Sequence, residues 1–146
     1  MTDIEKIINN AWEIKDQINS NSDKSIIDAI KEIINLLNEG KITVAEPQGS
    51  DWKINQWIQK GILLSFRVNK RKIIGGPYNA WNDLEHLPGK TAGWTEKDFE
   101  KAGFRMVPNC VVRNGSFIGK GAIIMPNAFL NIGSHCGQRS MVDGGA

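Results

Sequence analysis

Cysteine, histidine and long apolar runs are scarce in this chain of 146 residues. The two cysteines, Cys110 and Cys136, stand in no CxxC or Cys/His ligand spacing, so we expect free thiols and no metal site. No apolar stretch approaches the roughly 20 residues that span a bilayer, and the start MTDIEKIINN lacks a signal-peptide core. We therefore expect a cytoplasmic protein.

An excess of charge of either sign is also lacking. The 18 basic and 16 acidic side chains give a formal net charge of +2 and are spread along the sequence. This balance provides no polycationic surface for phosphate backbones, so neither nucleic acid nor a membrane is an expected partner. With 40% apolar and 23% charged residues the composition is that of an ordinary globular protein, and the length suits one or two small domains.

Apolar residues at helical spacing dominate the first forty residues. The first stripe contains Ile4, Ile7, Ile8, Ala11, Ile14 and Ile18. The second contains Ile26, Ile27, Ile30, Ile33, Ile34 and Leu37, and Gly40 follows it in a C-cap position. The pattern predicts two helices joined by the turn sequence NSNSDKS.

The middle of the chain mixes several signals. The alternating, β-branched residues 41–46 predict a short strand before Pro47, and residues 54–68 predict a third helix. Residues 75–94 are rich in Gly, Pro and aromatic residues and predict a loop, which either carries function or packs around Trp81 and Trp94. Thr95 and Asp98 form a capping-box pattern for a short helix that ends near Gly103.

The last 35 residues repeat with a period of six. The aliphatic or small apolar positions are Val112, Ile118, Ile124, Leu130, Cys136 and Val142. Four residues after each stands a small one: Ser116, Ala122, Ala128, Ser134, Ser140 and Ala146. Two linked positions that match six times in succession indicate a hexapeptide repeat.

A period of six suits a triangular prism in which each side is one short strand and the aliphatic residue fills the interior. We expect the first coils of a left-handed parallel β-helix, with unusual backbone angles at Gly119, Asn131, Gly137 and Asp143. Ordinary strands in a small sandwich are the alternative, but they do not explain the unbroken period. The expected fold is therefore mixed α/β, with a mainly helical domain over residues 1–107 and the β-helix over 108–146.

Several segments together resemble a known enzyme family. They are QWIQKGILLSFRVN, EKAGFRMVPNCVVRNGSFIGKGAIIMP, and NIG followed by MVD. The chain is similar over residues 1–143 to the N-terminal portion of tetrahydrodipicolinate N-succinyltransferases, within the hexapeptide-repeat acyltransferase superfamily. The resemblance implies succinyl transfer from succinyl-CoA to the amino group of open-chain tetrahydrodipicolinate in diaminopimelate and lysine biosynthesis. It also implies a homotrimer with active sites between neighbouring prisms, succinyl-CoA as co-substrate, and no permanently bound cofactor.

Two site residues follow from the resemblance. Arg105, in GFRMVP, matches the family arginine that binds a substrate carboxylate, a role that suits the planar guanidinium. Asp143, in MVD, matches the aspartate at the substrate amino group, where a carboxylate can orient the amine and accept its proton. From residue types alone, Arg105 could equally be a surface or helix-capping side chain, and Asp143 an ordinary corner residue of the repeat.

The sequence also departs from the family. SHCGQRS stands between NIG and MVD, where the family has an acidic segment, there is one more residue than expected between MP and NIG, and GGA follows MVD. We therefore expect a truncated chain that lacks later coils and does not complete the reaction alone.

Alternative functions remain open. A non-catalytic remnant or interaction module would explain the missing CoA surface. Another hexapeptide-repeat acyltransferase fits the repeat equally well. A prism-type carbonic anhydrase needs three zinc-binding histidines, whereas only His86 and His135 are present. His135 and Cys136 are adjacent on a predicted strand and so face opposite sides, which argues against a catalytic pair.

Overall fold

The computed structural model describes residues 2–75, 80–84 and 89–146 and divides into two compact units. Unit 1 comprises Met1–Ile33 and Val44–Leu87, and unit 2 comprises Ile34–Thr43 and Pro88–Ala146. Helix α2 (Lys24–Asn38) therefore contributes its N-terminal part to unit 1 and its C-terminal part to unit 2. The expected domain boundary after residue 107 stays a prediction.

Unit 1 is built around the predicted helices. They are α1 (Asp3–Glu13), the short 3-10 helix η1 (Lys15–Gln17), the first part of α2, and α3 (Gln56–Val68). Thr2 caps α1, because its hydroxyl accepts a hydrogen bond from the Glu5 N–H at 3.2 Å. Buried apolar side chains form the core: Ile8, Ala11, Ile18, Ala29, Ile30, Ile33, Ile58, Leu64, Val68 and Leu84. Ile14 departs from the predicted stripe, since it ends α1 and is exposed.

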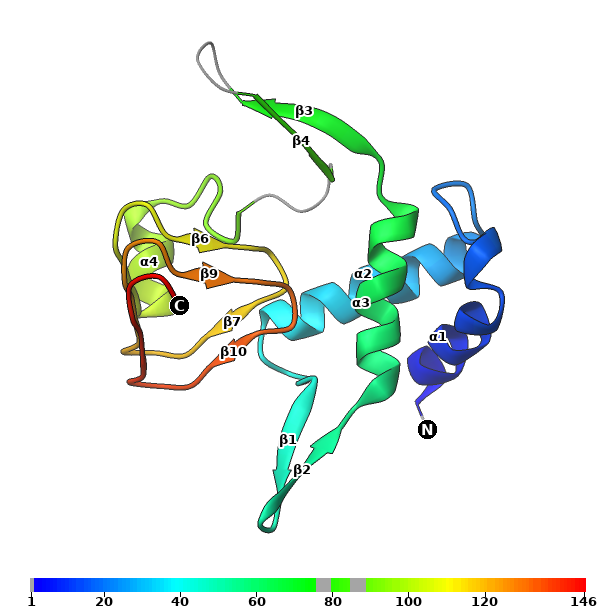
Figure 1. The fold of residues 1–146 in the computed structure, drawn as a ribbon, viewed down its shortest axis with the longest axis horizontal. Coiled ribbons are helices and arrows are strands. Elements are labelled where there is room, and N and C mark those ends of the chain that lie inside the picture. Colours follow the sequence, from blue (N-terminus) through cyan, green and yellow to red (C-terminus); the bar gives the residue numbers. More distant parts are fainter. Residues whose placement is uncertain (1, 76–79, 85–88) are drawn as a thin grey trace. The chain divides into compact units, whose positions relative to one another are not determined.

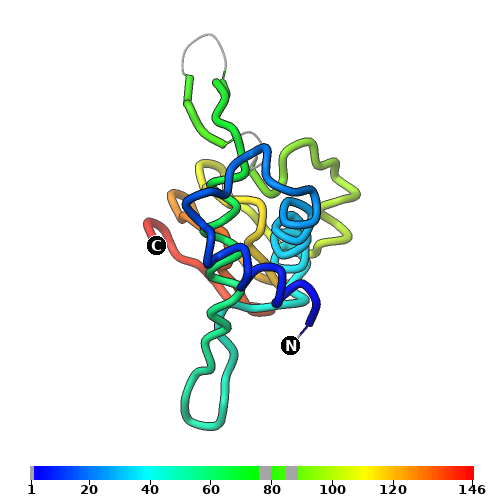
Figure 2. Tube along the Cα trace, turned by 90° about the vertical axis from the view of Figure 1, so that its right-hand side faces the viewer, coloured from blue at the N-terminus to red at the C-terminus, as the bar shows by residue number. Residues whose placement is uncertain are grey.

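Two antiparallel hairpins project from α3 in opposite directions (Figures 1 and 2). The first pairs β1 (Ala45–Gln48) with β2 (Asp51–Ile54), and the second pairs β3 (Arg71–Gly75) with β4 (Ala80–Leu84). The strand predicted over residues 41–46 is thus misplaced. It begins at Ala45 and runs through Pro47, which a two-stranded ribbon tolerates because each strand has a free edge. The loop predicted over residues 75–94 is wrong at β4.

Unit 2 begins its globular part with α4 (Glu96–Ala102), as the capping-box pattern predicts. Asp98 Oδ2 accepts hydrogen bonds from the Thr95 N–H and hydroxyl, both at 2.7 Å. Gly103 ends the helix in the left-handed region at φ 69°. The edge-to-face contacts of Phe99 with Trp94 and Phe104 tie α4 to the core that follows.

Seven two-residue strands follow α4. They are β5 (Arg105–Met106), β6 (Val111–Val112), β7 (Phe117–Ile118), β8 (Ile123–Ile124), β9 (Phe129–Leu130), β10 (His135–Cys136) and β11 (Met141–Val142). They form three parallel sheets, β6-β9, β7-β10 and β5-β8-β11. Each strand pairs with the one 18 residues further on, as in Val111↔Phe129 and Phe117↔His135. Three hexapeptides therefore make one coil, and Figure 1 shows β9 and β10 lying along β6 and β7.

The predicted inward positions are confirmed by burial. Val112, Ile118, Ile124, Leu130 and Cys136 are buried, and Val142 is partly buried against the same cluster. Phe104 completes this core at the side of α4, together with the partly buried Trp94 and Phe99. The prediction that His135 and Cys136 face opposite ways is also confirmed, since His135 is exposed and Cys136 is buried.

The corner geometry differs from the prediction. Gly119, Asn131, Gly137 and Asp143 do not have positive φ angles. Those angles occur two residues later in each hexapeptide, at Gly115, Gly121, Asn127, Gly133, Arg139 and Gly145. Gly119 instead permits close approach, because a Cβ there would lie 2.6 Å from the Gln138 backbone nitrogen of the next coil.

Candidate functional site

Arg105 lies at an outward-facing, exposed position of the sheet β5-β8-β11. Its N–H donates to the Ala122 carbonyl at 2.9 Å, which fixes the backbone in the ladder. Its register partner is Ile123, which pairs in turn with Met141 on β11. Because neighbouring residues in a strand point to opposite faces, Met106 points to the core and the Arg105 guanidinium extends from the outer face.

Asp143 follows directly after β11 and is exposed. Its carboxylate is exposed, and Oδ1 accepts a hydrogen bond from the Gly144 N–H at 2.7 Å. This local bond to the next residue occupies Oδ1 and leaves Oδ2 for another partner. A Cβ at Gly144 would lie 3.3 Å from the Pro126 carbonyl oxygen, so the turn sits close against the preceding coil.

The two predicted site residues are associated with the same sheet, Arg105 within β5 and Asp143 directly after β11. Arg105 stands on the first strand of the row and Asp143 just beyond the third. Two strand spacings of about 4.8 Å each separate β5 from β11 along the stack of coils, a separation at which the two side chains can contact opposite ends of one extended ligand.

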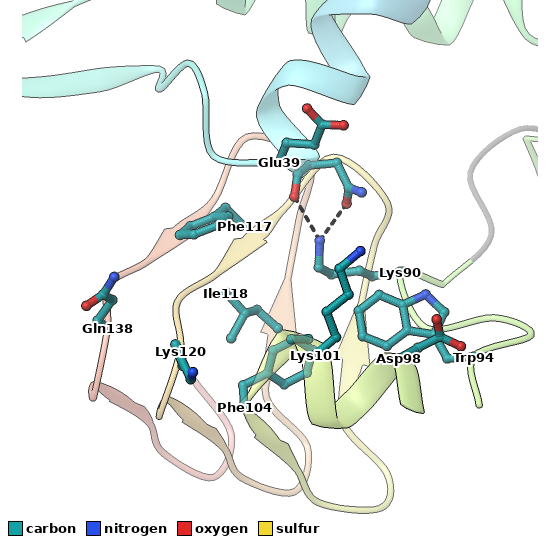
Figure 3. Close-up of a pocket in the computed structure, with 12 residues that line it drawn as sticks. Glu39, Lys90, Trp94, Asp98, Lys101, Phe104, Phe117, Ile118, Lys120 and Gln138 are labelled. Atoms are coloured by element: carbon teal, nitrogen blue, oxygen red, sulfur yellow. Dashed lines mark hydrogen bonds between the residues drawn. The ribbon is translucent and has the colours of Figure 1, made fainter. Parts of the chain in front are cut away.

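A separate cavity of 560 Å³ lies within unit 2 (Figure 3). Its lining residues come from the C-terminal end of α2, from α4 and the segments on either side of it, and from the chain around β7 and after β10: Asn38, Glu39, Lys90, Trp94, Asp98, Lys101, Ala102, Phe104, Phe117, Ile118, Lys120 and Gln138. The sequence analysis missed this site, because its residues come from segments far apart in the chain and share no motif.

Lys90 is the cavity residue whose pKa is shifted most strongly. Its Nζ donates to the Asn38 carbonyl at 3.0 Å and to Asn38 Oδ1 at 2.7 Å, as the dashed lines of Figure 3 show. Burial lowers the pKa of Lys90 to about 8, because desolvation penalises the ammonium form. Asn38 Oδ1 also accepts from the Gly115 N–H at 3.2 Å, so one amide joins α2, Lys90 and the first coil.

The histidines do not form a site in the described part of the chain. The His135 ring lies 4.6 Å from the Phe117 ring on the outer face of β7-β10. His86 lies outside the described residues. Among residues 2–75, 80–84 and 89–146, no group of three His, Cys, Asp or Glu side chains could hold a metal ion. No helix in these ranges is both long and apolar enough to cross a membrane.

Comparison with known sequences establishes the relationship. A family model described as Tetrahydrodipicolinate N-succinyltransferase N-terminal matches residues 3–68. A 2,3,4,5-tetrahydropyridine-2,6-dicarboxylate N-succinyltransferase of Pelagibacter ubique (strain HTCC1062) is 55% identical over 136 residues, which are 92% of this chain and 49% of that protein. Over most of its length the chain is similar to tetrahydrodipicolinate N-succinyltransferases. The resemblance of the sequence to this family is thereby confirmed.

Further N-succinyltransferases of the same name agree. The protein of Methylorubrum populi (strain ATCC BAA-705 / NCIMB 13946 / BJ001) is 46% identical over 142 residues, covering 96% of this chain and 50% of that protein. That of Parvibaculum lavamentivorans (strain DS-1 / DSM 13023 / NCIMB 13966) is 40% identical over 144 residues, covering 98% and 51%. The chain thus spans about half the length of the tetrahydrodipicolinate N-succinyltransferases that it matches.

Proposed function

We propose that this chain takes part in succinyl transfer from succinyl-CoA to the amino group of open-chain tetrahydrodipicolinate, in diaminopimelate and lysine biosynthesis. The observation that carries the proposal is the 55% identity to an N-succinyltransferase across 92% of the chain. The positions of Arg105 on β5 and of Asp143 directly after β11 of the same sheet support it, because a carboxylate-binding and an amine-binding group are both needed for this acceptor.

The proposal includes the architecture and assembly. The parallel coils are the start of a left-handed β-helix that occupies residues 108–146, preceded by a mainly helical domain over residues 1–107. The 18-residue register supports a three-sided coil. The active assembly is a cytoplasmic homotrimer, in which sites form between neighbouring prisms. Exposed apolar side chains on outer strand faces, Val111, Phe129 and Met141, support contacts between prisms.

Arg105 holds a carboxylate of the acceptor. A guanidinium presents two parallel N–H donors that match the two carboxylate oxygens, and such charge-assisted pairs are short and directional. The exposed position of Arg105 on β5, with its backbone fixed by Ala122, leaves the side chain accessible to a ligand on the outer face.

Asp143 acts on the amine. Only a neutral amine can attack the thioester. In the reaction its nitrogen forms a bond to the thioester carbonyl carbon, the carbon–sulfur bond breaks, and CoA leaves as the thiolate. Asp143 Oδ2 orients the amine and accepts the proton that the nitrogen loses, while Oδ1 stays bonded to the Gly144 N–H. Succinyl-CoA is a co-substrate in this scheme, and no permanently bound cofactor takes part.

Calorimetric titration of the purified chain with tetrahydrodipicolinate, alone and with succinyl-CoA, tests the proposal. We expect saturable binding of both compounds. Arg105→Ala should weaken acceptor binding by about 10- to 100-fold, because one charge-assisted bidentate contact is lost. Succinyl-CoA binding should remain unchanged.

Arg71→Ala is the matched control, since Arg71 is an exposed arginine on β3 of unit 1. It should bind the acceptor as the unmodified chain does. Equal affinity of the Arg105→Ala and Arg71→Ala variants would remove Arg105 from the site, and no saturable binding of either compound would contradict the proposed function.

A further inference from the structure

The cavity of unit 2 is lined by Lys90, whose ammonium has protein acceptors for only some of its hydrogen-bond donors. An ammonium has three N–H donors, and among the described residues Lys90 Nζ uses two of them on the Asn38 carbonyl and Asn38 Oδ1. Both acceptors belong to the end of α2, where helix carbonyls carry partial negative charge. The third N–H is therefore left for a partner in the cavity that Lys90 lines.

The charges that line the cavity leave cationic groups in excess. The lining includes three lysines, Lys90, Lys101 and Lys120, and two carboxylates, Glu39 and Asp98. Asp98 Oδ2 already accepts two hydrogen bonds from Thr95, and Glu39 Oε2 lies 2.6 Å from Lys41 Nζ. Figure 3 shows Lys101 extending from α4 towards the end of α2. The cavity thus suits a ligand with one negative charge.

Flat apolar surfaces supply the remaining walls. Trp94, Phe104 and Phe117 line the cavity, and each is held in place by neighbours. The Trp94 and Phe104 ring centroids are 5.8 Å apart. The Phe117 ring centroid lies 4.6 Å from that of His135, and a Cβ added at Gly40 would approach the Phe117 ring to 2.5 Å. Rigid aromatic walls favour a flat apolar ligand body, since little side-chain entropy is lost on binding.

We propose that this cavity binds a small aromatic monocarboxylate, with the carboxylate on Lys90 and Lys101 and the ring between Trp94 and Phe117. A volume of 560 Å³ suits such a ligand, because small-molecule pockets measure roughly 300–1,000 Å³. Gln138 and Lys120 also line the cavity and supply further donors. Arg105 and Asp143 are not among the lining residues, so this site is separate from the proposed acyl-acceptor site.

The test uses 2-naphthoate as probe and the whole chain, labelled with nitrogen-15. The Trp94 indole N–H resonance should shift saturably during the titration. Neutral 2-naphthamide, which has the same ring system, should bind at least about tenfold more weakly, because it cannot form the charge-assisted hydrogen bond. Lys90→Met should weaken 2-naphthoate binding by a similar factor, and Lys101→Met by a smaller one.

Lys97→Met is the control, since Lys97 is an exposed residue of α4 that does not line the cavity. It should leave the 2-naphthoate affinity unchanged. Equal affinities for 2-naphthoate and 2-naphthamide, or no saturable Trp94 shift at millimolar ligand, would overturn the proposal. The comparison of the two probes needs no variant, so it holds even if Lys90→Met fails to fold. No succinyl-CoA is involved, and failure of the proposed function leaves this test unaffected.

Discussion

At the scale of single residues, Ile124 shows how strongly the repeat constrains its interior positions. Its side chain is 0% exposed and stands at the centre of the core cluster that the six-residue period predicts. Ile124→Ala should lower the free energy of unfolding by about 2–5 kcal/mol, because transfer energy is lost and a cavity remains. Val111→Ala, at an outward position that is 52% exposed, should cost less than about 0.5 kcal/mol. Urea denaturation measures both values, and equal losses would contradict the inward assignment.

Lys90 predicts a pH dependence of stability. The pKa of Lys90 is about 8 in the folded chain, against an ordinary lysine pKa of 10.5 in the unfolded chain, so between these pH values the unfolded state binds more protons. The free energy of unfolding should therefore rise as pH increases from 8 to 10.5. Below pH 8 Lys90 is charged in both states, so the folded chain bears the full cost of desolvating its ammonium. Glu39, Asp98, Lys101 and Lys120 line the same cavity and set the local field.

The Lys90→Met variant should lack the rise in unfolding free energy that Lys90 causes, because methionine has no ammonium to desolvate. The urea midpoint at pH 8 and at pH 10 measures the difference, with Lys97→Met as the control for lysine loss on α4. Identical pH slopes for the unmodified chain and the Lys90→Met variant would show that Lys90 is not desolvated.

At the scale of elements, the stacking of coils depends on one close approach. A Cβ at Gly119 would meet three backbone atoms of the next coil at 2.6–2.8 Å, whereas a Cβ at the equivalent Gly137 would meet only Ser140 Oγ at 3.4 Å. Gly119→Ala should therefore destabilise the chain by roughly 1–3 kcal/mol, the usual cost of overpacking, and Gly137→Ala by clearly less. Thermal unfolding of the two variants makes the comparison, and equal melting temperatures would contradict the packing of β7 against β10.

The elements also show what local sequence signals can predict. The helices, the Thr95 capping box and the inward repeat positions follow from periods of 3.6 and six residues. The β3-β4 hairpin was missed because its strands carry exposed residues on both sides, as Ile73 and Trp81 show, and so lack the alternation that a buried face imposes. The sequence predicts that the first strand ends before Pro47, but β1 continues through it. A proline is tolerated there because each strand of a two-stranded ribbon has a free edge.

At the scale of the whole molecule, the two candidate sites differ in origin, because resemblance supplies the residues of one and only the fold assembles the other. Arg105 and Asp143 come from short motifs, and the register of β5, β8 and β11 places Arg105 in the same sheet as the strand that Asp143 follows. Lys90 and Asn38 are 52 positions apart in the sequence, and nothing in either local pattern indicates that they meet. Side-chain contacts of this kind depend on tertiary packing and not on periodicity.

The central claim is that the outer face of β5-β8-β11 binds the acyl acceptor. Titration of the nitrogen-15-labelled chain with tetrahydrodipicolinate tests it most directly, because every backbone amide reports separately. The account predicts saturable shifts at Arg105, Ile123, Met141 and Asp143, which require about 10- to 100-fold more acceptor in Arg105→Ala and the same acceptor concentration in Arg71→Ala. Shifts confined to other faces, or no shifts at saturating acceptor, would contradict it.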